Sequence, residues 1–138
     1  MADNDFTLRP IGFVRSELRD RRDAPRQGSD GAPNAWIEID PSLSPALQGI
    51  AKNDQIIVIT YLHESHRDVL KVHPRGDKNN PLRGVFATRS PDRPNPLGLH
   101  RVKVLEIDGC QLLVGPIEAI DGTPIVDIKP VLVESRDW

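Results

Sequence analysis

Short apolar runs separated by polar segments fill most of the chain, a pattern typical of a protein built mainly from β-strands. Residues 56–62 form the strongest run, which is continuous and rich in β-branched side chains and therefore predicts a central, buried strand. Residues 99–107 and 111–117 flank Asp108-Gly109, and Asp-Gly between apolar runs is the strongest local signal for a hairpin. These runs predict one central strand and one hairpin.

Four weaker runs predict further short strands, over residues 6–15, 36–39, 83–87 and 124–128. Ser44 and Pro45 suit the N-cap and first position of one short helix that ends near Gly49. Two polar stretches, residues 16–34 and 63–81, predict long loops, which in small domains are commonly functional. About seven strands with recurrent turn signals indicate a barrel or a sandwich.

Composition narrows the class of protein. A chain of 138 residues fits a single domain over residues 1–138, and 13 prolines with 10 glycines predict that it is rich in loops. The single cysteine excludes an internal disulfide framework, and no apolar run approaches the ~18 residues of a membrane span. The acidic N-terminus has no apolar segment of the kind found in signal peptides. We therefore expect a soluble cytoplasmic protein.

The net charge of −2 hides an uneven distribution along the chain. Residues 1–62 carry a net charge of −2, and residues 104–138 a net charge of −5. Residues 63–103 carry nine Lys or Arg against four Asp or Glu, a net charge of +5, together with all four histidines. Such a basic block indicates an anionic ligand or a nucleic acid. The alternative is a solvated surface that the acidic segments balance in the folded protein.

Several common catalytic motifs are missing from the sequence. No Gly-x-Gly occurs, so the Rossmann phosphate turn is excluded, and no glycine precedes a lysine, so a P-loop is excluded. There is also no Gly-x-Ser-x-Gly nucleophile elbow. His63-Glu64-Ser65-His66 has the wrong spacing for a His-Glu-x-x-His zinc helix, so we expect no metal site.

Three segments combine polar side chains with restricted backbone. Pro25-Arg26-Gln27 offers a guanidinium and an amide, which suit a carboxylate or the edge of a base, although this trio alone favours a plain surface loop. Residues 84–99 hold two arginines and an asparagine among prolines, and a rigid loop loses little entropy on binding. Residues 121–124 form an Asp-Gly-Thr-Pro turn. Beyond it, Asp127 and Lys129 share one strand face, where an ion pair is the plain structural explanation.

Together these segments resemble the TsaA-like, TrmO-type family of S-adenosylmethionine-dependent tRNA methyltransferases. The order and spacing of the matching pieces hold over nearly the whole chain, and the pieces are Ile11-Gly12 with Arg15-Ser16, residues 25–27, the strand into His63, residues 84–90, residues 93–98, residues 121–124 and residues 127–130. The resemblance implies a compact, mainly β, barrel-like single domain with one short helix and long functional loops. It also implies a homodimer with the cofactor site near the subunit interface.

The resemblance further implies an activity and a set of site residues. The characterised activity of the family is methylation of the exocyclic N6 nitrogen of threonylcarbamoyladenosine, next to the anticodon of tRNA, with S-adenosyl-L-methionine as the methyl donor. The residues that correspond to the cofactor pocket are Pro25, Arg26, Gln27, His63, Glu64, Arg89, Leu99, Asp121, Gly122, Thr123 and Pro124. The candidates for the catalytic, substrate-facing side are Arg93, Asn95, Asp127 and Lys129, with Asp127 as the hypothetical proton acceptor.

Two alternatives remain open at the level of sequence. Aromatic side chains stack on unpaired bases, yet the chain has only six aromatic residues. Val131 also stands where members of the family commonly have an aromatic residue. The same fold could therefore methylate a small-molecule acceptor. Otherwise it could bind an adenosyl ligand or RNA without modifying it.

Overall fold

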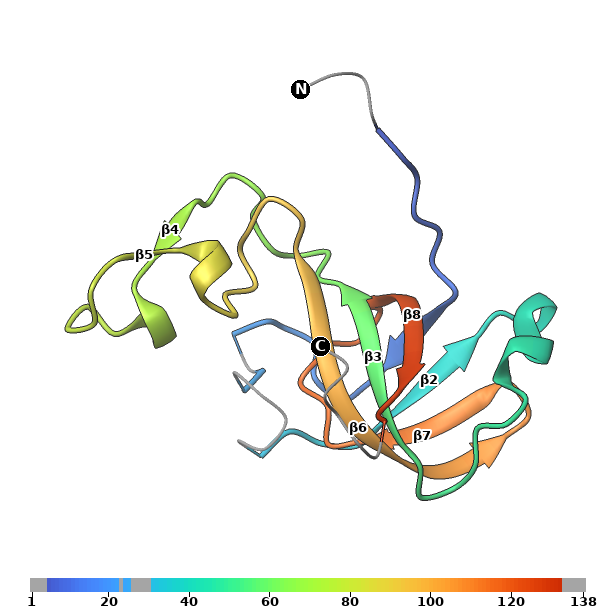
Figure 1. Cartoon of the computed structure of the whole chain (residues 1–138). Helices are drawn as coiled ribbons and strands as arrows, with labels where there is room; N and C mark the ends of the chain where they lie inside the picture. The colour runs from blue at the N-terminus through green and yellow to red at the C-terminus, as the bar shows by residue number, and fades with distance from the viewer. Residues whose placement is uncertain (1–4, 23, 26–30, 133–138) are drawn as a thin grey trace.

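The structure, a computed structural model, describes residues 5–22, 24–25 and 31–132 and is organised around a closed barrel of six antiparallel strands (Figure 1). Around the barrel the order of pairing is β1 (Gly12–Arg15), β2 (Ala35–Ile39), β7 (Gln111–Gly115), β6 (Leu97–Asp108), β3 (Gln55–Tyr61) and β8 (Pro124–Pro130), which pairs again with β1. Closure gives each of these strands two hydrogen-bonded neighbours. The mainly β, barrel-like fold is therefore confirmed.

Alternate positions of each strand fill the barrel with aliphatic side chains. On β3, Ile56 and Val58 point inward and are fully buried, whereas Ile57 and Ile59 between them stay half-buried on the outer face. Burial of each such side chain contributes roughly 1.5–3 kcal/mol to stability. The expected central strand is confirmed, because β3 lies between β6 and β8, but only one of its faces belongs to the core.

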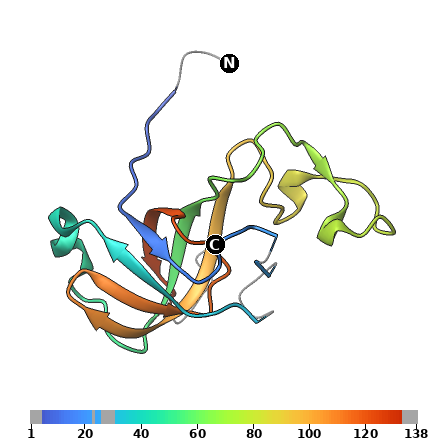
Figure 2. The same ribbon diagram turned by 180° about the vertical axis from the view of Figure 1, so that it is seen from behind.

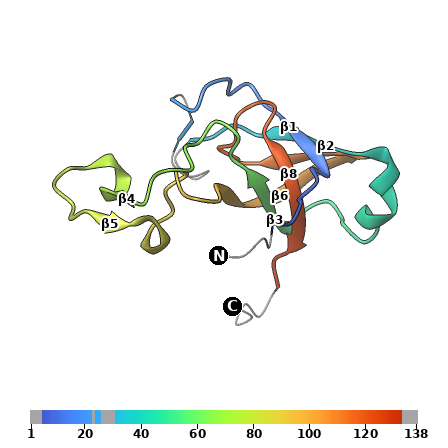
Figure 3. The same cartoon turned by 90° about the horizontal axis from the view of Figure 1, so that it is seen from above.

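A long excursion leaves the barrel between β3 and β6. We call residues 63–96 the arm; it contains a two-stranded sheet formed by β4 (Lys71–Val72) and β5 (Arg83–Gly84). The arm projects from one side of the barrel, opposite the 3-10 segment η2 (Pro41–Leu47) (Figures 1 and 3). From behind it again stands clear of the barrel wall (Figure 2). Its basic side chains are therefore displayed on a projecting feature.

The hairpin expected from Asp108-Gly109 joins β6 to β7, and Gly109 there adopts the positive φ of 60°. Asp108 still pairs with Gln111, so the turn itself consists of Gly109 and Cys110. The left-handed conformation explains the glycine, because residues with a Cβ rarely adopt it. The hairpin prediction is confirmed, with its turn shifted by one residue.

The expected helix begins earlier than its sequence signal. Asp40 caps it, because its carboxylate accepts a hydrogen bond of 2.9 Å from the Ser42 backbone N–H. Pro41 then takes the first position, and Pro45 lies inside the segment. In an α-helix the ring of a proline inside the segment would clash with the carbonyl four residues earlier, which disfavours an α-helix here, and the observed segment is a 3-10 helix. The prediction of a cap at Ser44 was wrong.

Two of the four weaker predicted strands are shorter than expected. Of residues 6–15 only Gly12–Arg15 form a strand, since Pro10 has no N–H for a ladder and Phe6 is exposed. Residues 83–87 pair only over β5, and the chain then turns in a 3-10 segment at Val85–Ala87. The Val85 carbonyl accepts hydrogen bonds from both the backbone N–H and the hydroxyl of Thr88, which holds this turn closed.

Candidate functional site

A broad cleft of about 1510 Å³ lies where the arm meets one end of the barrel. Its walls come from the 16–34 loop, the arm, the start of β6 and the connection from β7 to β8. Segments far apart in the sequence therefore share one concave surface. Clefts of this kind, lined by apolar side chains with a few polar groups, are the usual location of small-molecule sites.

The cleft brings together more than half of the site residues predicted from the sequence. Those that line it are Pro25, His63, Glu64, Arg89, Arg93, Asn95, Leu99 and Thr123. Those that do not are Asp121, Gly122, Pro124, Asp127 and Lys129. Arg26 and Gln27 lie outside the described residues.

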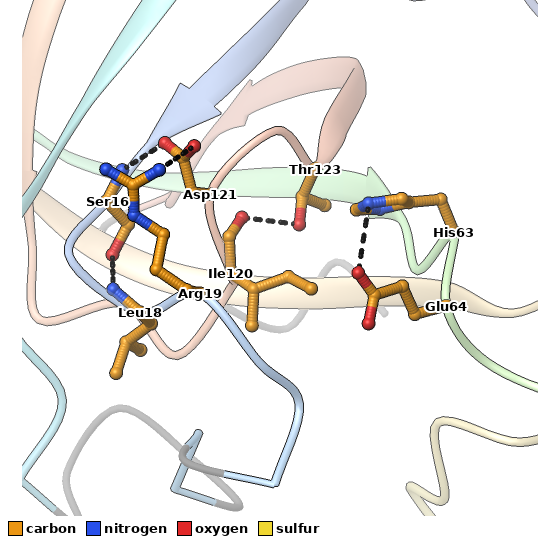
Figure 4. A network of polar contacts seen from close by, with 8 residues as sticks. All are labelled: Ser16, Leu18, Arg19, His63, Glu64, Ile120, Asp121 and Thr123. Atoms are coloured by element: carbon orange, nitrogen blue, oxygen red, sulfur yellow. Dashed lines mark hydrogen bonds and ion pairs between the residues drawn. The ribbon is translucent and has the colours of Figure 1, made fainter.

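The Asp-Gly-Thr-Pro turn fastens the 16–34 loop to the barrel. The Asp121 carboxylate accepts a 3.0 Å hydrogen bond from the Ser16 backbone N–H and lies 3.3 Å from the Arg19 guanidinium. Asp121 points toward this loop, whereas His63 and Glu64 lie on the other side of Thr123 (Figure 4). The Thr123 hydroxyl donates to the Ile120 carbonyl at 2.7 Å, which closes the turn. Asp121 thus acts on the loop, and Thr123 is the turn residue that faces the cleft.

His63 and Glu64 come one residue after the end of β3 and stand at the rim of the barrel. His63 Nε2 lies 3.8 Å from Glu64 Oε2, and their side chains are 33% and 47% exposed. Exposure on this scale leaves polar atoms of both residues accessible to a ligand in the cleft. Backbone contacts hold the segment in place, because the Glu64 carbonyl accepts a 3.1 Å hydrogen bond from Arg21.

Two arginines of the arm have different environments. The Arg93 guanidinium donates to the carbonyls of Val85, Thr88 and Ser90, each at 3.0 Å, and so braces the loop that contains Arg89. Among the described residues, the exposed Arg89 guanidinium has no hydrogen bond or ion pair. The geometry therefore assigns Arg93 to the loop and leaves Arg89 available to an anionic group.

Like Arg93, Asn95 makes a hydrogen bond within the arm. Its Oδ1 accepts a 3.0 Å hydrogen bond from Arg67, whose Nε also donates to the Pro94 carbonyl at 2.7 Å. The interaction closes the proline-rich part of the arm onto the segment that follows His63. Asn95 therefore lines the cleft while supporting its wall.

Asp127 and Lys129 lie on the outer face of the barrel. In the ladder between β8 and β3, Asp127 pairs with the outward-facing Ile59, and Lys129 pairs with the outward-facing Ile57. Lys129 Nζ lies 3.3 Å from Asp127 Oδ2, and the two side chains are about half exposed. The shared strand face and the ion pair expected from the sequence are both present. The pair faces away from the cleft of its own chain.

An ion pair that was not predicted from the sequence joins the arm to the 16–34 loop. Arg21 lies 3.1 Å from Asp92, which also accepts a 2.8 Å hydrogen bond from the His66 backbone N–H. Partial burial alone would raise the pKa of Asp92, but the hydrogen bonds from Arg21 and His66 and the Arg21 charge lower it below its ordinary value of 3.8. A run of alternating charges, Arg19-Asp20-Arg21-Arg22, gave no sign of which arginine makes this contact.

We expect Asp92→Asn to reduce the free energy of unfolding by about 1 kcal/mol at pH 7, a partly exposed ion pair contributing no more. Because the pKa of Asp92 is lowered in the folded state, its contribution is full above pH ~5 and disappears as the pH falls through the lowered value. Urea denaturation from pH 3 to pH 8 should show a constant difference at high pH that narrows below pH ~4. Asp108→Asn controls for the loss of a surface carboxylate, and a difference that widens in acid would contradict the prediction.

Three polar side chains that were not predicted from the sequence form a largely buried group at the wall of the cleft. His100 Nε2 lies 2.6 Å from Thr60 Oγ1, and His100 Nδ1 lies 2.6 Å from Glu118 Oε1. Thr60 and His100 occupy inward-facing strand positions, where the neighbours on each strand are valine or isoleucine. A polar residue at an inward position of an alternating strand was the available signal.

Two other features are not found in the part of the chain that the structure describes. No three His, Cys, Asp or Glu side chains are arranged there as a metal site. Likewise, none of the described helices is long and apolar enough to span a membrane.

Fold and site together define a ligand-binding β-barrel whose cleft combines a basic arm with an apolar barrel end. The comparison with known families is more specific. Residues 13–137 match the family described as tRNA-methyltransferase O N-terminal domain. The chain belongs to this family, which confirms the resemblance found in the sequence.

Individual relatives agree with this assignment. A probable S-adenosyl-L-methionine-binding protein of Methanothermobacter thermautotrophicus is 44% identical over 130 residues, which cover 94% of this chain and 93% of the relative. An S-adenosyl-L-methionine-binding protein of Archaeoglobus fulgidus is 42% identical over 122 residues, 88% of this chain and 86% of the relative. The crystal structure of TrmO from Pseudomonas aeruginosa matches with a TM-score of 0.77 and 26% identity. That match covers 97% of this chain and 59% of the solved one, so this chain spans about three-fifths of that length.

Proposed function

We propose that this protein is an S-adenosyl-L-methionine-dependent methyltransferase that methylates N6 of threonylcarbamoyladenosine next to the anticodon of tRNA. The observation that supports this most strongly is the convergence on one cleft of His63 from the start of the arm, Arg89 from the loop near its end, and Thr123 from the turn at residues 121–124. All three correspond to cofactor-pocket positions of the family to which the chain belongs. The names of the relatives support the same cofactor.

The side chains in the cleft fit the chemistry of this cofactor. Arg89 suits the methionyl carboxylate, because a guanidinium binds a carboxylate through two parallel hydrogen bonds. Leu99, which is 51% exposed, supplies an apolar wall for the adenosyl group. When bound, the cofactor supplies a methyl group already activated by the positive sulfonium. The chain must then hold the acceptor nitrogen in line with that methyl group and exclude water.

The side chains of the arm favour RNA as the second ligand. Lys71, Arg75, Lys78 and Arg83 are exposed on it, and in the described part of the chain their side chains make no ion pair or hydrogen bond. Phosphate groups are natural partners for such cations. Phe86, 81% exposed, also lines the cleft and offers a face on which an unpaired base can stack.

The proposal includes a homodimer in the cytoplasm, where tRNA is modified. Asp127 and Lys129 point away from the cleft of their own chain, so they can act on a substrate only if a second copy brings its cleft to this face. Asp127 would then accept the proton that N6 loses on methylation. Without such a contact the pair is a structural ion pair of the outer surface.

The experiment has two parts. Calorimetric titration should give saturable binding of S-adenosyl-L-methionine and none of adenosine triphosphate. The loaded protein should then add one methyl group to tRNA that contains threonylcarbamoyladenosine, and none to the same tRNA transcribed without modification, as measured by mass spectrometry of the nucleosides. Binding without transfer to either tRNA would contradict the proposed acceptor and favour a protein that binds the cofactor or modifies another molecule.

A further inference from the structure

A chain of hydrogen bonds runs from the barrel interior to the cleft. Thr60 is completely buried, the His100 side chain is 3% exposed, and the Glu118 side chain, which lines the cleft, is 20% exposed. The two contacts, Thr60 to His100 and His100 to Glu118, are both 2.6 Å long. A buried imidazole thus connects a barrel hydroxyl to a carboxylate that can meet a ligand.

The surrounding barrel is shaped for this arrangement. Gly98 pairs with Thr60 across the β3–β6 ladder. A Cβ at position 98 would come within 2.7 Å of Thr60 Oγ1 and 2.8 Å of His100 Nε2, so any larger residue would collide with the contact. Burial of polar groups is costly unless they are hydrogen-bonded. Glycine at 98 therefore leaves the space in which these polar groups satisfy one another.

The hydrogen bond between Thr60 and His100 indicates which ring nitrogen of His100 carries a hydrogen. Among the described residues the Thr60 hydroxyl has His100 as its hydrogen-bond partner. If the hydroxyl donates to Nε2, the imidazole is neutral and its Nδ1 hydrogen is donated to Glu118. A proton on both ring nitrogens would instead leave the hydroxyl hydrogen without an acceptor in the described structure. We therefore assign the ring hydrogen to Nδ1, which donates it to one oxygen of the Glu118 carboxylate.

Glu118 stands apart from the other carboxylates of the cleft. Asp92 is paired with Arg21, and Glu64 lies beside His63. In the described part of the chain Glu118 has no Lys or Arg partner, its Oε1 contacts His100, and its Oε2 has no hydrogen bond. One oxygen is thus fixed by His100, and the other is available at the wall of the cleft.

We propose that Glu118, aligned by His100 and Thr60, binds the positively charged group of the methionyl part of the cofactor. This inference rests on the proposed function. The methionyl part carries a carboxylate, an ammonium and a sulfonium, so it needs an anion as well as a cation from the protein. Arg89 binds the carboxylate, and Glu118 binds the ammonium or the sulfonium. His100 also lines the cleft, but its side chain is only 3% exposed and both ring nitrogens are engaged by Thr60 and Glu118, so we treat His100 and Thr60 as positioning residues that act through Glu118.

Glu118→Gln is the direct test, since the amide keeps the shape and can still accept the hydrogen bond from His100. We expect affinity for S-adenosyl-L-methionine to fall at least tenfold in calorimetric titration, with affinity for adenosine and the melting temperature unchanged. Glu106→Gln, an exposed glutamate of β6 outside the cleft, is the matched control. S-adenosyl-L-homocysteine, which has the ammonium but no sulfonium charge, separates the two sources: an equal loss identifies the ammonium, and an unchanged affinity identifies the sulfonium.

The positioning role has its own readout. His100→Leu should weaken S-adenosyl-L-methionine about as much as Glu118→Gln, and the double variant should lose nothing further. His100→Asn, which can still donate to Glu118, should recover most of the affinity. If His100→Leu fails to fold, the comparison of His100→Asn with Glu118→Gln still tests the alignment.

The outcomes separate this inference from the proposed function. A wild-type protein that binds S-adenosyl-L-methionine, with a Glu118→Gln variant that binds it within twofold, would overturn the role of Glu118 alone. The same holds if adenosine is weakened as much as the cofactor, because the effect would then be structural. A wild-type protein that does not bind the cofactor would overturn the proposed function first.

Discussion

Arg93→Lys is expected to open the loop over residues 85–90 and to lower affinity for S-adenosyl-L-methionine roughly 10- to 100-fold. The guanidinium reaches three backbone carbonyls at once, from Val85, Thr88 and Ser90. An ammonium keeps the charge but cannot span the three acceptors, because its donors radiate from one atom. Hydrogen bonds from a charged donor contribute about 1.5–3 kcal/mol each, so the closed loop loses most of its support.

Arg89→Ala provides the comparison that separates bracing from ligand contact. It removes the available guanidinium but leaves the three Arg93 hydrogen bonds in place, so the loop should stay closed. Hydrogen exchange of the amides of residues 85–90 should therefore accelerate in Arg93→Lys and stay at the wild-type rate in Arg89→Ala, although both variants bind the cofactor weakly. Arg15→Ala, which removes only an exposed ion pair with Glu38, should change neither measurement.

Slow exchange in Arg93→Lys would show that the loop does not depend on these hydrogen bonds. Normal cofactor affinity in the same variant would show that the loop does not shape the site. Either result would return Arg93 to the substrate-facing role that the family resemblance suggested for it. The two measurements are needed together because binding alone cannot distinguish a contact from a support.

Local sequence signals accounted for the strands of the barrel but not for all of their ends. The continuous run at residues 56–62 and the Asp-Gly turn were sufficient to predict a central strand and a hairpin, since each depends on neighbours in sequence. The start of the helix was misplaced because Asp40-Pro41 and Ser44-Pro45 both place a good cap before a proline, and the segment begins at the first of the two. Such competition between adjacent signals is settled by the fold.

The site also has parts that local sequence predicts and parts that it does not. Motifs with fixed backbone, such as residues 84–99 and 121–124, could be recognised in the sequence because their spacing is local. The contact between Thr60 and His100 joins positions 40 residues apart, and it depends on the register of β3 against β6. Arg21 and Asp92 are 71 residues apart and meet only when the arm folds back on the loop. Sequence reasoning had no means of pairing them.

The walls of the cleft that come from the barrel depend on closure of the barrel, and closure depends on β1. This strand has four residues, pairs with β2 along its whole length and reaches β8 through Gly12 and Phe13. The turn that contains Asp121 is tied to β1, because the Gly122 N–H donates to the Val14 carbonyl at 2.7 Å. A displacement of β1 would therefore move the wall of the cleft as well as open the barrel.

Gly12→Ala should destabilise the protein by about 3 kcal/mol and lower its melting temperature by roughly 10 °C. A Cβ at position 12 would stand 2.2 Å from the Glu38 carbonyl oxygen and 3.0 Å from its carbon. Both are backbone atoms of the paired strand, so β1 and β2 must separate to relieve the collision. The requirement explains a glycine at the beginning of a strand, where its conformational freedom would otherwise cost stability.

Gly84→Ala is the matched control, because a Cβ there meets only the Leu70 carbonyl oxygen, at 4.0 Å, and the backbone conformation is extended. Differential scanning calorimetry should give a melting temperature near wild type for Gly84→Ala and a clear decrease for Gly12→Ala. Equal melting temperatures would mean that β1 can shift without cost, and that closure of the barrel does not depend on the close approach of β1 to β2. The cofactor affinity of Gly12→Ala, measured well below its melting temperature, should fall too, because the turn at residues 121–124 moves with β1.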